Sequence, residues 1–117
     1  MLDQPVPDEE WADLVFNALA DPTRRDILRR SMDGELSVSA LARSYTMSFA
    51  AVQKHVAVLG RAGLVTKHRQ GRQQLVRTDM TTVHAAQRLL DGFEAVWRAR
   101  IERFTDVLTT PEQGAVQ

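Results

Sequence analysis

Residues 47–65 read MSFAAVQKHVAVLGRAGLV, and this stretch has the pattern of a single short helix with a signal at each end. Ser48 is a preferred N-cap residue, because its hydroxyl accepts a hydrogen bond from a backbone N–H of the first turn. Gly63 is a preferred helix stop, because glycine readily adopts the left-handed conformation that ends many helices. The pattern therefore predicts a helix from residue 48 to about residue 62.

The preceding stretch, residues 36–46, reads LSVSALARSYT and repeats the same arrangement. Ser37 caps a predicted helix over Val38–Tyr45. Only about three residues, Thr46–Ser48, connect the two helices, so they should cross steeply as in a helix-turn-helix. Each helix also has an apolar residue before its cap and one at its fourth position, which form a hydrophobic staple: Leu36 with Leu41, and Met47 with Val52.

The two sides of the second helix differ in chemistry. The helical period gathers one set that we expect to pack inward: Val52, His55, Val56 and Leu59. The opposite side combines small residues with one amide and two cations: Ala50, Gln53, Lys54, Ala57 and Arg61, with Phe49 at the border. It contains no acid, whereas a side that served only solubility would normally include Glu.

Such a surface suits the major groove of DNA. Small side chains let a helix approach the bases closely, and Gln53 can pair bidentately with adenine. Lys54 can reach guanine or a phosphate, and Phe49 can contact a thymine methyl group. The sequence therefore predicts a recognition helix.

A β-hairpin is predicted next, from Val65–Arg69 and Arg72–Thr78, with Gln70-Gly71 between the strands. Four basic or titratable residues surround its tip, which suits phosphates or a narrow minor groove: Lys67, His68, Arg69 and Arg72. The predicted DNA contacts of the helix and the hairpin together are Ser48, Phe49, Ala50, Gln53, Lys54, Ala57, Arg61, Lys67, Arg69 and Arg72.

Charge is segregated along the chain, although 15 basic and 15 acidic residues give a net charge of zero. Residues 1–21 hold six acids and no Lys or Arg, whereas seven Lys and Arg and no acid lie between Glu35 and Asp79. A basic region attracts polyanions whatever the overall isoelectric point. Charge alone leaves open the alternative of a solubilising surface balanced by the acidic start.

Helices are predicted on both sides of this region, over residues 8–20, over residues 22–31 after the cap Asp21-Pro22, and from Thr82 to about Thr109. The 117 residues suit one domain, over 8–109, with flexible ends at 1–7 and 110–117. The predicted fold is mainly α with a β-hairpin wing, a winged helix-turn-helix.

The last predicted helix carries aromatic residues on one stripe, and each can bury on the order of 150–250 Å². So small a monomer has little surface to cover them, so we expect a second copy of the chain to cover this stripe in a homodimer. The alternative is packing against the helix of Trp11 within one chain. The predicted interface residues are Trp11, Leu14, Leu90, Phe93, Trp97, Ile101, Phe104 and Leu108.

The stretch Met47–Leu59, followed by Ala62-Gly63-Leu64-Val65, resembles the recognition helix of ArsR-type winged helix-turn-helix regulators. Leu19–Leu28 is similar to the start of the second helix of that family, and the similarity covers nearly the whole predicted ordered chain. The resemblance implies a homodimer in which the first and last helices form the interface and two recognition helices read a palindrome.

Departures from the family pattern limit what the resemblance implies. Gln53 stands where the family commonly has Ser or Thr, and Ala57 where a basic residue is common, so the operator sequence does not transfer. The helix Val38–Tyr45 lacks the cysteines with which founding members sense metals. The chain resembles the cysteine-free branch, whose last helix similarly carries Trp and Arg, here Trp97 and Arg100, and whose inducer is often unknown.

Several classes of protein are disfavoured. The acidic start does not resemble a secretory signal and no apolar run approaches eighteen residues, so we expect a cytoplasmic protein away from the membrane. The histidines His55, His68 and His84 are scattered, without a phosphate loop or nucleophile motif, so we expect no enzyme and no cofactor.

We predict a repressor that binds a palindromic operator in double-stranded DNA as a homodimer, with its effector unknown. Two alternatives stay open. One is a metal-responsive repressor that uses carboxylates and a histidine near the last helix, although their spacing forms no compact ligand motif: Asp79, His84, Asp91 and Glu94. The other is a winged helix that binds a protein, since fold alone does not determine function.

Overall fold

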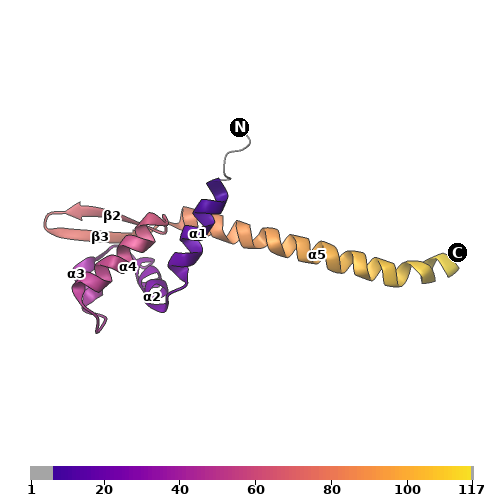
Figure 1. The fold of residues 1–117 in the computed structure, drawn as a ribbon, viewed down its shortest axis with the longest axis horizontal. Helices are drawn as coiled ribbons and strands as arrows, with labels where there is room; N and C mark the ends of the chain where they lie inside the picture. The colour runs from indigo at the N-terminus through magenta and orange to yellow at the C-terminus, as the bar shows by residue number, and fades with distance from the viewer. Residues whose placement is uncertain (1–6, 117) are drawn as a thin grey trace. The chain divides into compact units, whose positions relative to one another are not determined.

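The computed structural model describes the backbone of residues 7–116 and the side chains of residues 10–108. Within that part of the chain the elements follow the order of Figure 1: α1 (Pro7–Leu19), α2 (Pro22–Ser31), β1 (Leu36–Ser37), α3 (Val38–Ala42), α4 (Phe49–Arg61), β2 (Val65–Gln70), β3 (Gln73–Thr78) and α5 (Met80–Val116). The chain divides into two compact units, residues 1–83 and residues 84–117. The first unit is a winged helix-turn-helix.

The predicted helix caps are confirmed in the first unit. The Asp21 carboxylate accepts a hydrogen bond from the backbone N–H of Arg24 at 3.0 Å and begins α2. The hydroxyls of Ser37 and Ser48 accept in the same way from residues 40 and 51, at 3.0 and 3.1 Å. These bonds satisfy backbone groups that have no partner inside the helix, which is why the three starts were predictable.

The third helix ends earlier than predicted, at Ala42 instead of Tyr45. The chain tightens there, because the N–H groups of Ser44 and Tyr45 bond to carbonyls three residues back, at 2.9 and 3.3 Å. Such short-range bonds end an α-helix and turn the chain. Tyr45 therefore belongs to the connection between α3 and α4.

The wing contains three antiparallel strands in the order β1-β3-β2, not the two of the predicted hairpin. In β1, Leu36 pairs with Val76 and Ser37 pairs with Leu75. A strand of two residues is too short to show an alternating pattern, so the sequence revealed only the cap and staple roles of these residues. The extra strand ties the entry of α3 to the middle of the sheet.

The turn of the wing lies one residue later than predicted. Gln70 still pairs with Gln73 at the end of the ladder, so the two turn residues are Gly71 and Arg72. Gly71 has φ +63°, whereas the non-glycine residues of the described chain have no positive φ. Glycine at the first turn position and an ordinary residue at the second is the pattern of a type II′ turn. This register places Arg72 at the tip.

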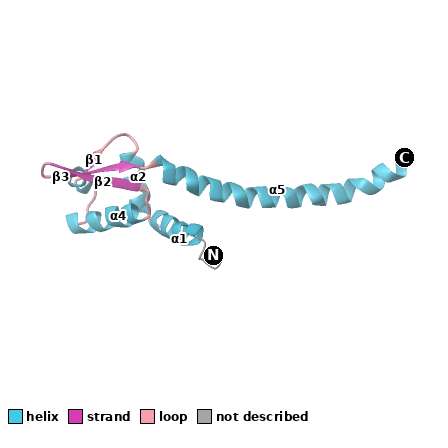
Figure 2. Cartoon of the chain, turned by 90° about the horizontal axis from the view of Figure 1, so that it is seen from above, coloured by secondary structure: helices cyan, strands magenta, loops and turns pink. Residues whose placement is uncertain are grey.

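The core of the first unit lies between its helices and the sheet. Figure 2 shows α4 running alongside the sheet, and α4 contacts both α2 and β2. Ser31, at the end of α2, is buried and satisfied by bonds to the Leu28 carbonyl at 3.0 Å and to the Thr78 hydroxyl at 2.8 Å. The largest fully buried apolar side chains are Ile27, Leu41, Leu59, Leu64, Val15, Val52, Val56 and Val76.

The last helix, α5, extends beyond both predicted ends, from Met80 to Val116 instead of Thr82 to about Thr109. Pro111 therefore does not end the helix as expected. The side chains of residues 1–7 and 110–117 all lie outside the described part, so their predicted flexibility stays a prediction. The single domain over 8–109 also stays a prediction. No helix in the described residues is long and apolar enough to span a membrane.

We expect Gly71→Val to destabilise the wing, because a β-branched residue at φ +63° strains the backbone by roughly 1–2 kcal/mol. Gly71→Asn should be milder, since Asn tolerates the left-handed region. Urea unfolding and amide exchange of residues 65–78 measure the effect. Equal stability of the valine and asparagine variants would contradict the turn geometry.

Candidate nucleic-acid interface

The recognition helix α4 has the two sides that the sequence predicted. Val52, Val56 and Leu59 are buried, and His55 is half-buried beside them. On the opposite side, Ala57 is partly covered. The other residues of that side are exposed: Ala50, Gln53, Lys54 and Arg61. Ser48 and Phe49 are exposed at the start of the helix, with Phe49 46% accessible. The predicted reading surface is therefore open to solvent.

A guanidinium holds three helices together behind this surface. The Arg24 side chain donates to the carbonyls of Asn17 and Ala18, at 3.0 and 2.8 Å, which lie in the last turn of α1. Its Nη1 also lies 3.3 Å from Nδ1 of His55 in α4. Arg25 donates to the Leu19 carbonyl at 2.8 Å. Arg24 and Arg25 therefore cap the C-terminal end of α1, and Arg24 also contacts α4. The sequence did not predict this role.

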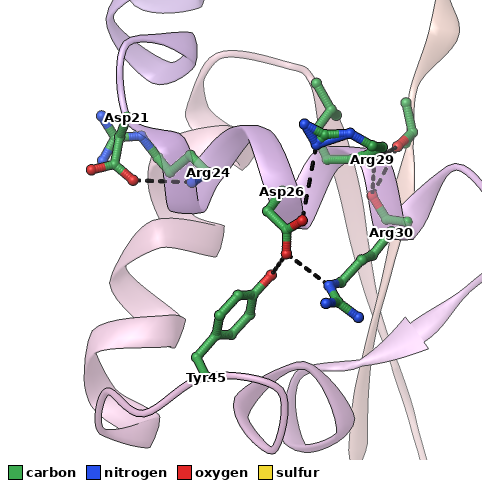
Figure 3. A network of polar contacts seen from close by, with 9 residues as sticks. Asp21, Arg24, Asp26, Arg29, Arg30 and Tyr45 are labelled. Atoms are coloured by element: carbon green, nitrogen blue, oxygen red, sulfur yellow. Dashed lines mark hydrogen bonds and ion pairs between the residues drawn. The ribbon is translucent and has the colours of Figure 1, made fainter.

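His55 lies between two opposite charges of α2. Its Nδ1 is 3.9 Å from the Asp21 carboxylate, in addition to its contact with Arg24. The hydrogen bond from the Arg24 backbone N–H lowers the pKa of Asp21 below its ordinary value. Burial acts in the opposite direction but does not outweigh the hydrogen bond. The carboxylate that caps α2 thus stays ionised and faces the histidine of the recognition helix. Figure 3 shows Asp21 beside Arg24 at the start of α2.

A second polar cluster fixes the connection between α3 and α4. The Tyr45 hydroxyl donates to the Asp26 carboxylate of α2 at 2.5 Å, and Arg30 Nε donates to the same carboxylate oxygen at 2.7 Å (Figure 3). The Arg30 guanidinium also lies over the Tyr45 ring, 5.7 Å from its centre. The helix-turn-helix connection is therefore attached to α2 at Tyr45, three residues after the end of α3.

Ionisation in this cluster supports the same bonds. The hydrogen bonds from Arg30 and Tyr45 lower the pKa of Asp26, so the acceptor is charged at neutral pH. Burial and the hydrogen bond to Asp26 raise the pKa of Tyr45 to about 12, so its hydroxyl keeps the proton that it donates. Charge-assisted bonds of this kind are stronger than neutral ones.

The wing presents cations on the side of the sheet that also faces α4. Along β2, Lys67 and Arg69 point to one side of the sheet, and Thr66 and His68 point to the other. Lys67 is opposite the buried Val76, so Lys67 and Arg69 are on the side that faces the core. His68 points to the other side, where its Nδ1 lies 3.3 Å from the Glu35 carboxylate. The histidine is thus paired with an acid. The exposed cations of β2 and the turn are Lys67, Arg69 and Arg72, and Arg77 of β3 pairs with Thr66.

Comparisons with known proteins bear on this arrangement. The family model described as "Bacterial regulatory protein, arsR family" matches residues 21–67. The HTH-type transcriptional regulator Rv2034 of Mycobacterium tuberculosis is 39% identical over 87 residues, which are 74% of this chain and 77% of the relative. The transcriptional repressor SdpR of Bacillus subtilis is 33% identical over 57 residues, 49% of this chain and 63% of that relative.

The chain belongs to the ArsR family. It is a DNA-binding transcriptional regulator, not an enzyme, and it contains no cysteine. Among solved structures, an ArsR-like transcriptional regulator from Rhodococcus sp. RHA1 has a TM-score of 0.78 and 29% identity, over 87% of this chain and 96% of its own. The homodimeric winged helix-turn-helix domain of Mb0332 from Mycobacterium bovis shares the fold, with a TM-score of 0.62 and 23% identity, over 80% and 91%.

The ArsR-family regulator has apolar side chains exposed in α1 and α5. In α1, Leu14 is exposed and Trp11 is half-buried. In α5 the exposed set contains every residue of that helix predicted at an interface: Leu90, Phe93, Trp97, Ile101, Phe104 and Leu108. Val96 and Val107, which the sequence analysis omitted, are also exposed. Each helix therefore has apolar side chains exposed to solvent.

Two of the four residues suggested as metal ligands in this ArsR-family chain have structural partners. The Asp79 carboxylate accepts from the backbone N–H of Thr81 at 3.0 Å, near the start of α5. Glu94 pairs with Arg98 one turn later at 3.0 Å. Among the described residues, no group of three His, Cys, Asp or Glu comes together as a metal site.

We expect Asp26→Asn to destabilise the ArsR-family regulator at pH 7, since the charged acceptor of Arg30 and Tyr45 is lost. Because the folded-state pKa of Asp26 lies below its ordinary 3.8, its contribution is present above that pH and is lost as the pH falls through the folded value. The difference between wild type and variant should therefore shrink below pH 3.8. Urea unfolding at pH 7 and in acid measures it.

Tyr45→Phe serves as the companion variant. It removes one donor and should cost about 1 kcal/mol of unfolding free energy. It should also raise the pKa of Asp26 towards its ordinary value. An Asp26→Asn penalty that is the same at neutral and acid pH would contradict the charged cluster.

Proposed function

We propose that this regulator is a repressor that binds a palindromic operator as a homodimer and occupies the promoter. The exposed, acid-free side of α4 carries the proposal, because Gln53 and Lys54 project from a helix whose other side is buried. The similarity to a repressor of Bacillus subtilis supports the direction of control. A protein that acts on a promoter works where the DNA lies, so we place it in the cytoplasm.

Base reading is assigned to α4. Gln53 presents an amide that can hydrogen-bond both edge groups of an adenine, and Lys54 follows it on the exposed side. Ala50 and Ala57 keep that side narrow enough for the major groove, and Phe49 offers its ring to a thymine methyl group. The exposed hydroxyl of Ser48, which caps the helix, stands at the end that approaches the DNA.

The backbone of the DNA is assigned to the cations around α4 and the wing, which supply affinity without sequence information. Lys67, Arg69 and Arg72 are exposed, and Arg61 lies in the last turn of α4. In the described part of the chain, no carboxylate lies within 4.0 Å of these side chains. Their charges are therefore available to phosphates.

A homodimer through α1 and α5 follows from the exposed apolar residues of these helices. Phe93, Trp97 and Phe104 are 65%, 58% and 64% accessible, which is costly for aromatic side chains in water. They recur at helical spacing together with Leu90, Ile101 and Leu108, so a second copy can cover one continuous stripe. The homodimeric Mycobacterium bovis domain of the same fold supports this assembly.

Gln53→Ala should relax base preference and cost roughly 1–3 kcal/mol at the selected site, with little change on random DNA. Arg72→Ala should weaken binding to all sequences alike and flatten the dependence of affinity on salt. Fluorescence anisotropy with a duplex obtained by in vitro selection and with random duplex measures both. Equal losses on the two duplexes for Gln53→Ala would contradict base reading by α4, and no binding to random duplex at low salt would favour a protein-binding winged helix.

Trp97→Glu and Phe104→Glu should give monomers that bind the operator poorly, because a buried unpaired charge opposes association. Ala95→Glu is the matched control, since residue 95 lies on the opposite side of α5 from Trp97 and should leave the dimer intact. Sedimentation at micromolar concentration measures the assembly. A wild-type monomer that binds the operator tightly would overturn the dimer proposal.

A further inference from the structure

An open groove of about 500 Å³ runs between the C-terminal half of α4 and strand β2. Its walls come from two elements that the DNA-binding surface also uses. The lining residues are Ala57, Gly60, Arg61, Val65, Thr66 and Lys67. Ala57 and Gly60 project little or no side chain, so the groove exists because these two positions of α4 are small.

The groove is positively charged from both walls. Arg61 contributes a guanidinium from α4, and Lys67 contributes an ammonium from β2. Both are exposed, and among the described residues neither has a carboxylate within 4.0 Å. Thr66 completes the β2 wall between Val65 and Lys67. Two cations without acidic partners around a hollow of this kind favour an anion.

Gly60 determines the course of the Lys67 side chain. A Cβ added at Gly60 would lie 3.4 Å from Cε and 3.8 Å from Nζ of Lys67. The lysine therefore passes directly over the glycine and keeps its ammonium beside α4. A single methyl group at this position would make only ordinary contact. A longer side chain would occupy the groove and displace the ammonium.

We propose that this groove seats one phosphate of the DNA backbone, with Arg61 and Lys67 gripping it from α4 and from the wing, and that Gly60 keeps the seat open. This inference rests on the proposed DNA-binding surface and specifies one contact within it. A phosphate held from two elements fixes the orientation of the wing and the recognition helix on the duplex. Gly60 is thus a positioning residue that itself bears no charge.

The test compares the salt dependence of binding in four variants of the full chain with wild type, with labelled duplex of random sequence as the probe. Because the seat holds one phosphate, Arg61→Ala and Lys67→Ala should each reduce the magnitude of the slope of log affinity against log salt by up to about 0.9 per protomer. Gly60→Leu should lower it by nearly as much as the two together, although the net charge is unchanged. Gly60→Ala, whose methyl group makes only ordinary contact with Lys67, should reduce the slope less than Gly60→Leu does.

Two controls test whether Gly60→Leu acts through Lys67 and whether that variant is folded. Lys67→Ala added to Gly60→Leu should lower the slope less than Lys67→Ala does alone, because the ammonium has already been displaced. Thermal unfolding should show that Gly60→Leu is folded at the assay temperature. If that variant is unfolded, Arg61→Ala and Lys67→Ala decide the question, and wild-type slopes in both would overturn the proposal.

The outcomes separate this inference from the proposed function. Failure of the wild type to bind duplex at low salt would overturn DNA binding by this surface as a whole. Binding with a wild-type slope in folded Gly60→Leu would overturn the phosphate seat alone. Inorganic phosphate is titrated in parallel, with the amides of Gly60 and Thr66 as the readout. Submillimolar phosphate binding that Gly60→Leu abolishes, without a change in the DNA slope, would assign the groove to a free anion and overturn the DNA assignment.

Discussion

Burial of Val52, Val56 and Leu59 determines which side of α4 meets solvent, and the position of the proposed DNA-binding surface follows from it. Each of these side chains stabilises the fold by roughly 1.5–3 kcal/mol when removed from water. Rotation of α4 about its axis would expose them and bury the polar side, including Lys54, without partners. The orientation of the reading surface is therefore a consequence of core packing.

Packing alone leaves α4 free to slide or tilt, and two polar clusters of α2 restrict it. Arg24 reaches His55 in the middle of the recognition helix, and Asp26 holds Tyr45 just before that helix begins. One cluster therefore acts on the helix itself and the other on its entry. Hydrogen bonds are directional, so they specify position more finely than apolar contacts do. Both clusters use side chains of one short helix.

Local signals made the helix starts and the two sides of α4 predictable, because a cap such as Ser48 and a helical period act within a few residues. The partners of Arg24 and of His68 were not predictable in this way. Arg24 lies 31 residues from His55, and Glu35 reaches His68 only after the sheet has formed. The third strand and the turn at Gly71 depend on pairing register, which no local pattern specifies. The groove at Gly60 likewise requires the wing to lie beside α4.

The contacts of Arg24 also connect the helix proposed for dimerisation, α1, with the helix proposed for base reading, α4. The same guanidinium bonds to the last turn of α1 and contacts His55 in α4, so it links these two helices within the first unit. If α1 contributes to the dimer, the spacing of the two reading surfaces is transmitted through Asn17, Ala18 and Arg24 instead of through a flexible connection. A palindrome requires a fixed spacing of its half-sites, because each recognition helix must meet the major groove in register. In the proposed dimer, the capping arginines of α2 would serve operator recognition although neither is assigned a contact with the DNA.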